Sequence, residues 1–143
     1  MPTPSVPETK IGFFRDVGAS FFLNQCEINI GKYIGITGQV LSGNDAVAIG
    51  LADGLLMSKD LQNNWNLLTK SSLMNVRDRI NKLQAQCIIL KDTTHTPSWF
   101  DPRLTLIFGQ ESFGKALEKL AGLSGEWAEK TLLKLKKRSP IML

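Results

Sequence analysis

The sequence predicts a mainly helical protein, and three observations lead to that prediction. Apolar residues recur at helical spacing in several segments, most clearly at Val76, Ile80, Leu83 and Cys87. Residues that cap helices stand just before several of these segments. Only two short apolar runs, residues 51–56 and 104–108, are candidates for strands. Helices should therefore make up most of the fold.

Three helices are predicted in the first third of the chain, each after a side chain that can accept hydrogen bonds from the first turn. The second and third end at glycines, which adopt the left-handed conformation at little cost. The expected elements are residues 17–25 after Asp16, Ile30–Thr37 between Asn29 and Gly38, and residues 43–49 between Ser42 and Gly50.

Further helices and loops are predicted in the remainder. The last helix cannot continue past Pro140, whose ring blocks helix extension. The expected elements are a strand or turn at 51–56, a short helix around Leu61, Trp65 and Leu68, an amphipathic helix at 72–87, a loop at 91–100, a strand or helical turn at 104–108, a helix at Phe113–Ala121 capped by Ser112, and a helix at 126–137.

The composition is typical of a soluble globular chain, with 43% hydrophobic and 21% charged residues over 143 positions. No apolar run approaches the roughly 18 residues that span a bilayer, and the first residues do not have the basic and then apolar pattern of a secretory signal. We therefore expect a cytoplasmic location and no membrane association. Cys26 and Cys87 are expected to fill core positions. No cysteine or histidine spacing indicates a metal site.

Some residues are of types common at functional sites, but their sequence context favours a structural or solvent-exposed role. His95, the single histidine, has no nucleophile or orienting acid at a recognisable spacing, so a surface loop histidine is expected. The net charge of +4 is mild. The basic run that begins at Lys130 and ends at Arg138 alternates with leucines and lacks stacking aromatics, which favours a solvated helix face over binding of nucleic acid or phosphates. The three tryptophans, Trp65, Trp99 and Trp127, are expected in a core or an interface.

Two carboxylates near the N-terminus are the candidate catalytic groups. Glu8 follows Pro7 at the end of an extended segment, and Asp16 stands at the start of a predicted helix. Both would be held firmly, as acid, base or nucleophilic chemistry on a small substrate requires. Spacing alone favours solvated surface carboxylates.

The residues around Glu8 and Asp16 favour a catalytic role over a solvated surface role. Pro7-Glu8-Thr9, Ile11-Gly12-Phe13-Phe14 and Asp16-Val17-Gly18 are followed by Gly31-Lys32-Tyr33-Ile34-Gly35-Ile36-Thr37-Gly38, Leu41-Ser42-Gly43-Asn44-Asp45-Ala46 and Ile49-Gly50-Leu51-Ala52. In this order they resemble the crotonase superfamily, and within it the 3-hydroxyisobutyryl-CoA hydrolase branch beside the enoyl-CoA hydratases and isomerases. The likeness covers residues 6–56 and returns at 127–140.

The resemblance implies an acyl-CoA thioester hydrolase of valine catabolism. Glu8 would be the catalytic glutamate, Asp16 the aspartate that marks the hydrolases, and Gly12 part of the substrate-binding loop. Coenzyme A would enter with the substrate, and no separate cofactor or metal is implied. One difference is Arg15, which stands where the hydrolases usually have proline. Proline would fix the loop, whereas arginine frees it and favours the ionised form of Asp16.

The resemblance also implies a truncated middle fragment, the helical portion of a crotonase-like α/β (β-β-α spiral) fold with most of the sheet missing. Residues 1–56 would hold the active-site loop and helices, with 1–5 disordered. Residues 57–143 would be a truncated helical C-terminal region in the same structural unit. The family's oxyanion-hole donors lie before the matched segment, so little activity is expected from this chain alone. Self-association or a complementary N-terminal half is expected, and the alternatives are a non-catalytic remnant or interaction subunit, or a hydratase/isomerase relative.

Overall fold

The computed structural model describes residues 18–27, 29–70, 75–87, 89–90 and 95–138. Its regular elements are helices apart from one pair of two-residue strands, and turns and loops join them. The prediction of a mainly helical fold is confirmed. The elements are α2 (Ala19–Leu23), α3 (Ile30–Thr37), α4 (Gly43–Ala48), β1 (Gly54–Leu55), the 3₁₀ helix η1 (Ser58–Asp60), α5 (Leu61–Lys70), α6 (Val76–Gln84), β2 (Ile89–Leu90), α7 (Leu104–Phe108), α8 (Phe113–Ala121) and α9 (Glu126–Lys136).

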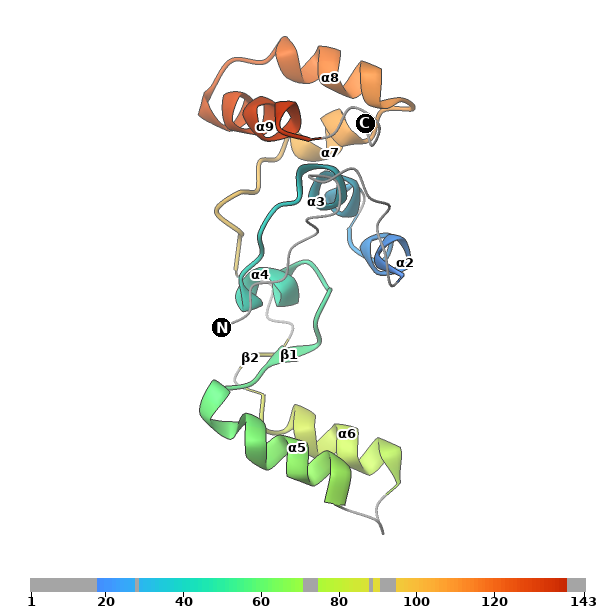
Figure 1. Cartoon of the computed structure of the whole chain (residues 1–143), viewed down its shortest axis with the longest axis vertical. Helices are drawn as coiled ribbons and strands as arrows, with labels where there is room; N and C mark the ends of the chain where they lie inside the picture. The colour runs from blue at the N-terminus through green and yellow to red at the C-terminus, as the bar shows by residue number, and fades with distance from the viewer. Residues whose placement is uncertain (1–17, 28, 71–74, 88, 91–94, 139–143) are drawn as a thin grey trace.

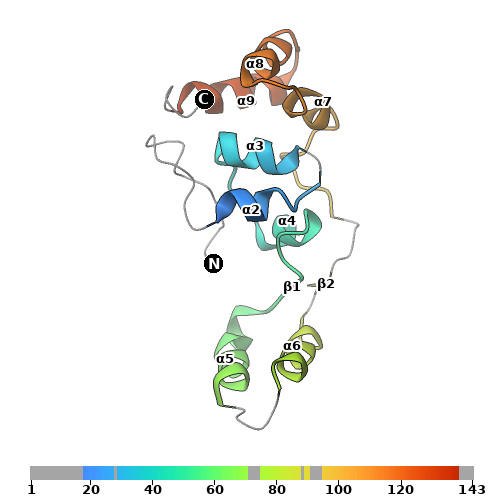
Figure 2. The ribbon, with the colours of Figure 1, turned by 90° about the vertical axis from the view of Figure 1, so that its right-hand side faces the viewer.

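The described part of the chain is elongated. Helices α7, α8 and α9 lie at one end above α3, with α2 and α4 below them, and the α5–α6 hairpin projects at the other end (Figures 1 and 2). Strands β1 and β2 pair antiparallel, with Gly54 opposite Leu90 and Leu55 opposite Ile89. This narrow two-stranded ribbon joins the α5–α6 hairpin to the other helices. Helices that precede the hairpin in the sequence and helices that follow it lie together at the opposite end.

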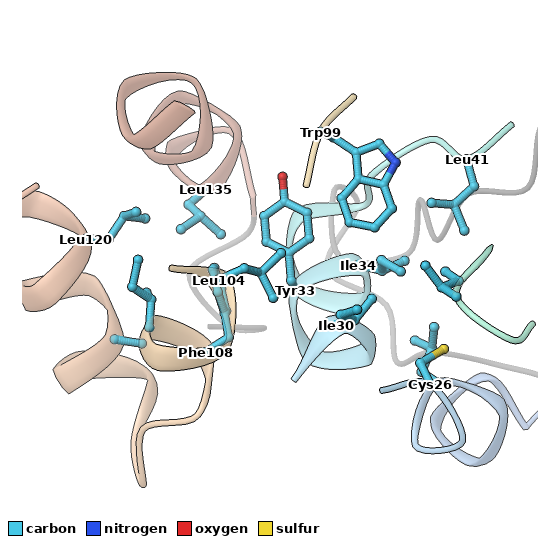
Figure 3. Close-up of a cluster of buried hydrophobic side chains, with 14 of the residues drawn as sticks. Cys26, Ile30, Tyr33, Ile34, Leu41, Trp99, Leu104, Phe108, Leu120 and Leu135 are labelled. Carbon is cyan, nitrogen blue, oxygen red and sulfur yellow. The ribbon is translucent and has the colours of Figure 1, made fainter. Parts of the chain in front are cut away.

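The core is built around α3. Tyr33 and Ile34 are each 1% exposed, and α3 packs against α2, α7 and α9. The Tyr33 ring stacks on Trp99 at a centroid distance of 5.7 Å and meets Phe108 edge-on at 5.2 Å (Figure 3). Residues from three separate segments therefore form one aromatic cluster. A short helix such as α3 is stable only through this packing.

A glycine sets the distance between α2 and α3. A Cβ atom built on Gly31 would lie 1.8 Å from the carbonyl oxygen of Leu23. No side chain fits there, because the backbones of the two segments touch. Gly31 therefore belongs to the packing of the helical end.

The helix ends predicted at Ser42, Ser112 and Gly38 are confirmed, and the cap predicted at Asn29 is not. Ser42 forms a capping box with Asp45, because its Oγ accepts from the Asp45 N–H at 3.1 Å and its own N–H donates to Asp45 Oδ2 at 2.8 Å. Ser112 caps α8, and Gly38 ends α3 in the left-handed conformation with φ of 58°. The predicted cap by Asn29 is wrong. Its φ is 69°, and its side-chain amide donates to the Thr105 carbonyl across the helix interface instead of accepting from α3.

The sequence placed some elements more accurately than others. The run at 104–108 is a helix, and the segments predicted at 17–25 and 72–87 contain the shorter helices α2 and α6. The proposed Asp16 cap and Pro140 lie outside the described residues. Cys26 is buried as predicted, whereas Cys87 is only partly buried, and both thiols are free. In the ranges that the structure describes, no helix is long and apolar enough to cross a membrane.

The tryptophans are not all in the core. Trp99 is buried and Trp127 partly buried, but Trp65 is 61% exposed on α5. The periodic residues Val76 and Ile80 on α6 are also exposed. Apart from η1, which leads directly into α5, the hairpin makes no substantial contact with another helix of the described chain. Its apolar residues therefore face outward, since no core lies beside them.

Candidate functional site

The site residues predicted from the sequence are Glu8, Gly12 and Asp16. All three lie outside the described residues, as does Arg15. The nearest described element is α2. It begins after Gly18, whose own backbone is in the left-handed conformation with φ of 73°. The catalytic and substrate-binding roles of these residues stay predictions.

A polar cluster does appear where the sequence showed no pattern. Asp45 on α4 lies 2.9 Å from the imidazole Nε2 of His95, through its Oδ1 atom. Its other oxygen accepts the Ser42 N–H. The Asp45 side chain is 10% exposed and that of His95 is 41% exposed. His95 is an exposed loop residue, as predicted, but the fold brings it an orienting aspartate from 50 positions away, which no spacing in the sequence indicates.

The Asp45 carboxylate is held in its ionised form. Burial on its own would raise the pKa of Asp45, but hydrogen bonds from Ser42 and His95 outweigh it, so the pKa lies below its ordinary value. Trp99 acts in the same direction from close by, although its indole Nε1 makes no hydrogen bond within the described residues. A carboxylate in this state can fix the orientation of an imidazole ring.

His95 opens onto a small depression of about 180 Å³. Its walls are largely apolar and include Ile30, Ile49 and Phe100. The oriented imidazole meets one requirement of a general base. Among the described residues that line this depression there is no cysteine, and burial raises the pKa of the Cys26 thiol, which keeps it protonated. Among the described residues, the pair acts as a clamp between α4 and the loop before α7.

The basic end of α9 is also placed differently from the prediction. Lys134 donates to the Gln39 side-chain oxygen, and the Arg138 guanidinium donates to the Thr37 carbonyl. That carbonyl belongs to the last turn of α3, where cations are favoured by the helix dipole. Both side chains are partly buried. The prediction of a solvated face is therefore wrong at these two positions, because they bind the end of another helix.

Metal binding has no support in the part of the chain that is described. No group of three or more histidine, cysteine, aspartate or glutamate side chains lies close enough together there to hold an ion. His95 and Asp45 form a pair, and Asp45 also accepts from the Ser42 N–H.

The family is shown by comparison with known proteins. The enoyl-CoA hydratase/isomerase family model matches residues 3–143, and the chain belongs to this family. It is 31% identical over 150 aligned residues to the mitochondrial 3-hydroxyisobutyryl-CoA hydrolase of Dictyostelium discoideum, with 97% of this chain and 37% of that protein covered. The corresponding Gallus gallus protein is 30% identical, with the same two coverages.

Another relative is named as a ribosomal protein and not as a hydrolase. The small ribosomal subunit protein mS47 of Arabidopsis thaliana is 29% identical, covering 96% of this chain and 34% of that protein. The chain thus spans little more than a third of the curated relatives it matches.

The fold has a counterpart among solved structures. A carnitinyl-CoA dehydratase from Mycobacterium thermoresistibile superposes with a TM-score of 0.73 at 21% identity, covering 98% of this chain and 39% of that one. The described helices therefore correspond to the helical portion of a crotonase fold, as the sequence predicted.

Proposed function

We propose that this chain supplies the catalytic loop of an acyl-CoA thioester hydrolase of the 3-hydroxyisobutyryl-CoA type, acting in valine catabolism. The observation that supports this most directly is the match along almost the whole chain to two proteins named as that hydrolase. Their names include a mitochondrial location, whereas the sequence led us to expect a cytoplasmic one, and that expectation stays a prediction.

The proposed chemistry assigns each motif residue a task. Glu8 activates the attacking water or attacks the thioester carbonyl itself, Asp16 assists the hydrolytic outcome, and Gly12 lets the loop approach the substrate closely. Arg15 favours the ionised form of Asp16. Asp16 also favours a hydrolase over a hydratase or isomerase, since the resemblance implies that the hydratases have a small residue at this position.

The activity is expected to need more than these 143 residues. The resemblance places the oxyanion-hole donors before Val6, and loss of one such donor typically lowers kcat by about 10²–10³-fold. We therefore expect low turnover from the chain alone and higher turnover when an N-terminal half from a related hydrolase is supplied. Calorimetry with coenzyme A, with and without that half, measures the binding step.

The catalytic assignment is tested on the complemented protein with 3-hydroxyisobutyryl-CoA. Glu8→Gln should abolish thioester cleavage and Asp16→Asn should lower kcat, because each removes a reacting or assisting carboxylate. Glu118→Gln on exposed α8 is the matched control and should leave turnover unchanged. Cleavage that persists in Glu8→Gln would refute the assignment.

A non-catalytic interaction subunit is the second candidate, and the exposed hairpin favours it. Leu61, Trp65, Val76 and Ile80 stay uncovered on α5 and α6, and exposed apolar groups of this size usually meet a partner. A relative named as a ribosomal protein also fits a role within an assembly. A complemented protein that binds no coenzyme A, yet folds cooperatively, would favour this candidate.

A further inference from the structure

A cavity of about 260 Å³ opens beside the central aromatic cluster, between α9 and the loop before α7. Three rings form one side of it. The Tyr33 ring lies nearly parallel to those of Trp99 and Trp127, at centroid distances of 5.7 and 6.2 Å. The Trp127 Nε1 donates to the Trp99 backbone carbonyl at 3.0 Å, which fixes the Trp127 indole. The cavity thus has a rigid aromatic wall that an apolar or planar molecule can contact.

The opposite side of the cavity is basic. Lys130 and Lys134 line it, and Arg138 follows four residues later, so the three cations form one stripe. Burial lowers the pKa of Lys134, and repulsion from Arg138 and Lys130 lowers it further. Burial is the larger cause, and only the repulsion reflects the closeness of the three cations.

The counter-charges near this stripe are few. Glu126 also lines the cavity and pairs with Lys130 at 2.6 Å, but both side chains are well exposed. The acceptors that Lys134 and Arg138 meet in the described chain are a side-chain amide and a peptide carbonyl, both neutral. An anion near Lys134 would therefore relieve the repulsion along the stripe.

Hydroxyl groups complete the lining. Ser98, on the loop beside Trp99, has an exposed side chain, whereas Thr131 is 1% exposed and its hydroxyl bonds Tyr33. Hydroxyls donate to carboxylate and phosphate oxygens. The cavity therefore combines a cation, hydrogen-bond donors and a stacked aromatic wall. Its volume exceeds the roughly 150 Å³ that admits benzene and falls just short of drug-sized pockets.

We propose that this cavity binds a small organic anion, a carboxylate or phosphate carried on an apolar or planar body. Lys134 is its main charged contact and Lys130 a secondary one. The aromatic wall holds the body chiefly through Trp127, because Tyr33 is only 1% and Trp99 only 8% exposed. The site uses none of the residues assigned to thioester hydrolysis, so it stands independently of that function.

The test uses the protein's own tryptophans as reporters. Trp99 and Trp127 line the cavity, and Trp65→Phe removes the third tryptophan, which lies on exposed α5. Benzoate, phenyl phosphate and neutral benzyl alcohol are titrated at constant ionic strength. We expect a saturable fluorescence change with an anion and about tenfold weaker binding of the alcohol, equivalent to losing one charge-assisted hydrogen bond. The tighter of the two anions identifies the headgroup.

Lysine variants then locate the contact. Lys134→Gln should weaken anion binding about tenfold, while Lys136→Gln, an exposed lysine on the same helix, should not change it. The Lys130 side chain is exposed, and Lys130→Gln should weaken anion binding about twofold. If Lys134→Gln fails to fold, this variant tests whether a lysine of the stripe contacts the anion. The absence of saturable binding by either anion, equal affinity for benzyl alcohol, or unchanged binding in both Lys134→Gln and Lys130→Gln would overturn the proposal.

Discussion

At the scale of single residues, Asp45 has two roles in one place. It completes the capping box of α4 and holds His95 on a loop 50 positions away. The capping box follows from the local sequence, because Ser42 and Asp45 have the required spacing. The contact with His95 does not, since nothing in the sequence relates those two positions.

We predict that Asp45→Asn lowers the free energy of unfolding by about 1–2 kcal/mol, because it weakens a helix cap and a charge-assisted hydrogen bond. The pKa of Asp45 is lowered in the folded state. Its contribution is therefore fully present above the carboxyl's unfolded pKa and is lost as the pH falls through the folded value. Urea denaturation of both proteins from pH 7 to pH 2 measures this. A difference that grows as the pH falls would contradict it.

At the scale of elements, close contact between α2 and α3 depends on Gly31. We predict that Gly31→Ala destabilises the protein by several kcal/mol or prevents folding, since the new Cβ would collide with the Leu23 carbonyl. Gly114→Ala on α8 is the matched control. Its Cβ meets nothing nearer than 4.0 Å, so the change should be neutral or stabilising by up to about 1 kcal/mol.

Thermal unfolding of the two glycine variants, followed by circular dichroism, makes this comparison. Equal melting temperatures for Gly31→Ala and Gly114→Ala would mean that α2 and α3 do not approach as closely as described. The helices themselves were predicted well where caps or glycines marked their ends, as at Gly38 and Ser112. Asn29 failed because its side chain found a partner on α7.

At the scale of the whole molecule, the α5–α6 hairpin stands apart from the aromatic core (Figures 1 and 2). Two short helices with exposed apolar side chains bury too little surface to be stable by themselves. A covering surface, from a second copy or from the complementary half of the family fold, would supply the missing burial.

We predict that the chain self-associates through this hairpin. The double variant Trp65→Gln, Ile80→Gln should raise the monomer fraction in light scattering after size-exclusion chromatography, because it removes exposed apolar area. Its melting temperature should change little, since both side chains are exposed. Leu133→Gln, on exposed α9 surface at the other end, is the control. A parent chain that is monomeric and melts sharply would contradict this prediction.

The sequence by itself determined the helical character, most helix ends and the family. It also indicated Glu8 and Asp16 as catalytic and Gly12 as substrate-binding, and these assignments stay predictions. These depend on local spacing, on caps and on motifs, all of which can be read along the chain. Only the tertiary structure decided that His95 meets Asp45, that Lys134 and Arg138 cover the end of α3, and that Trp65 faces outward. Such contacts join positions far apart, and they arise from how the helices pack around Tyr33, which no local pattern records.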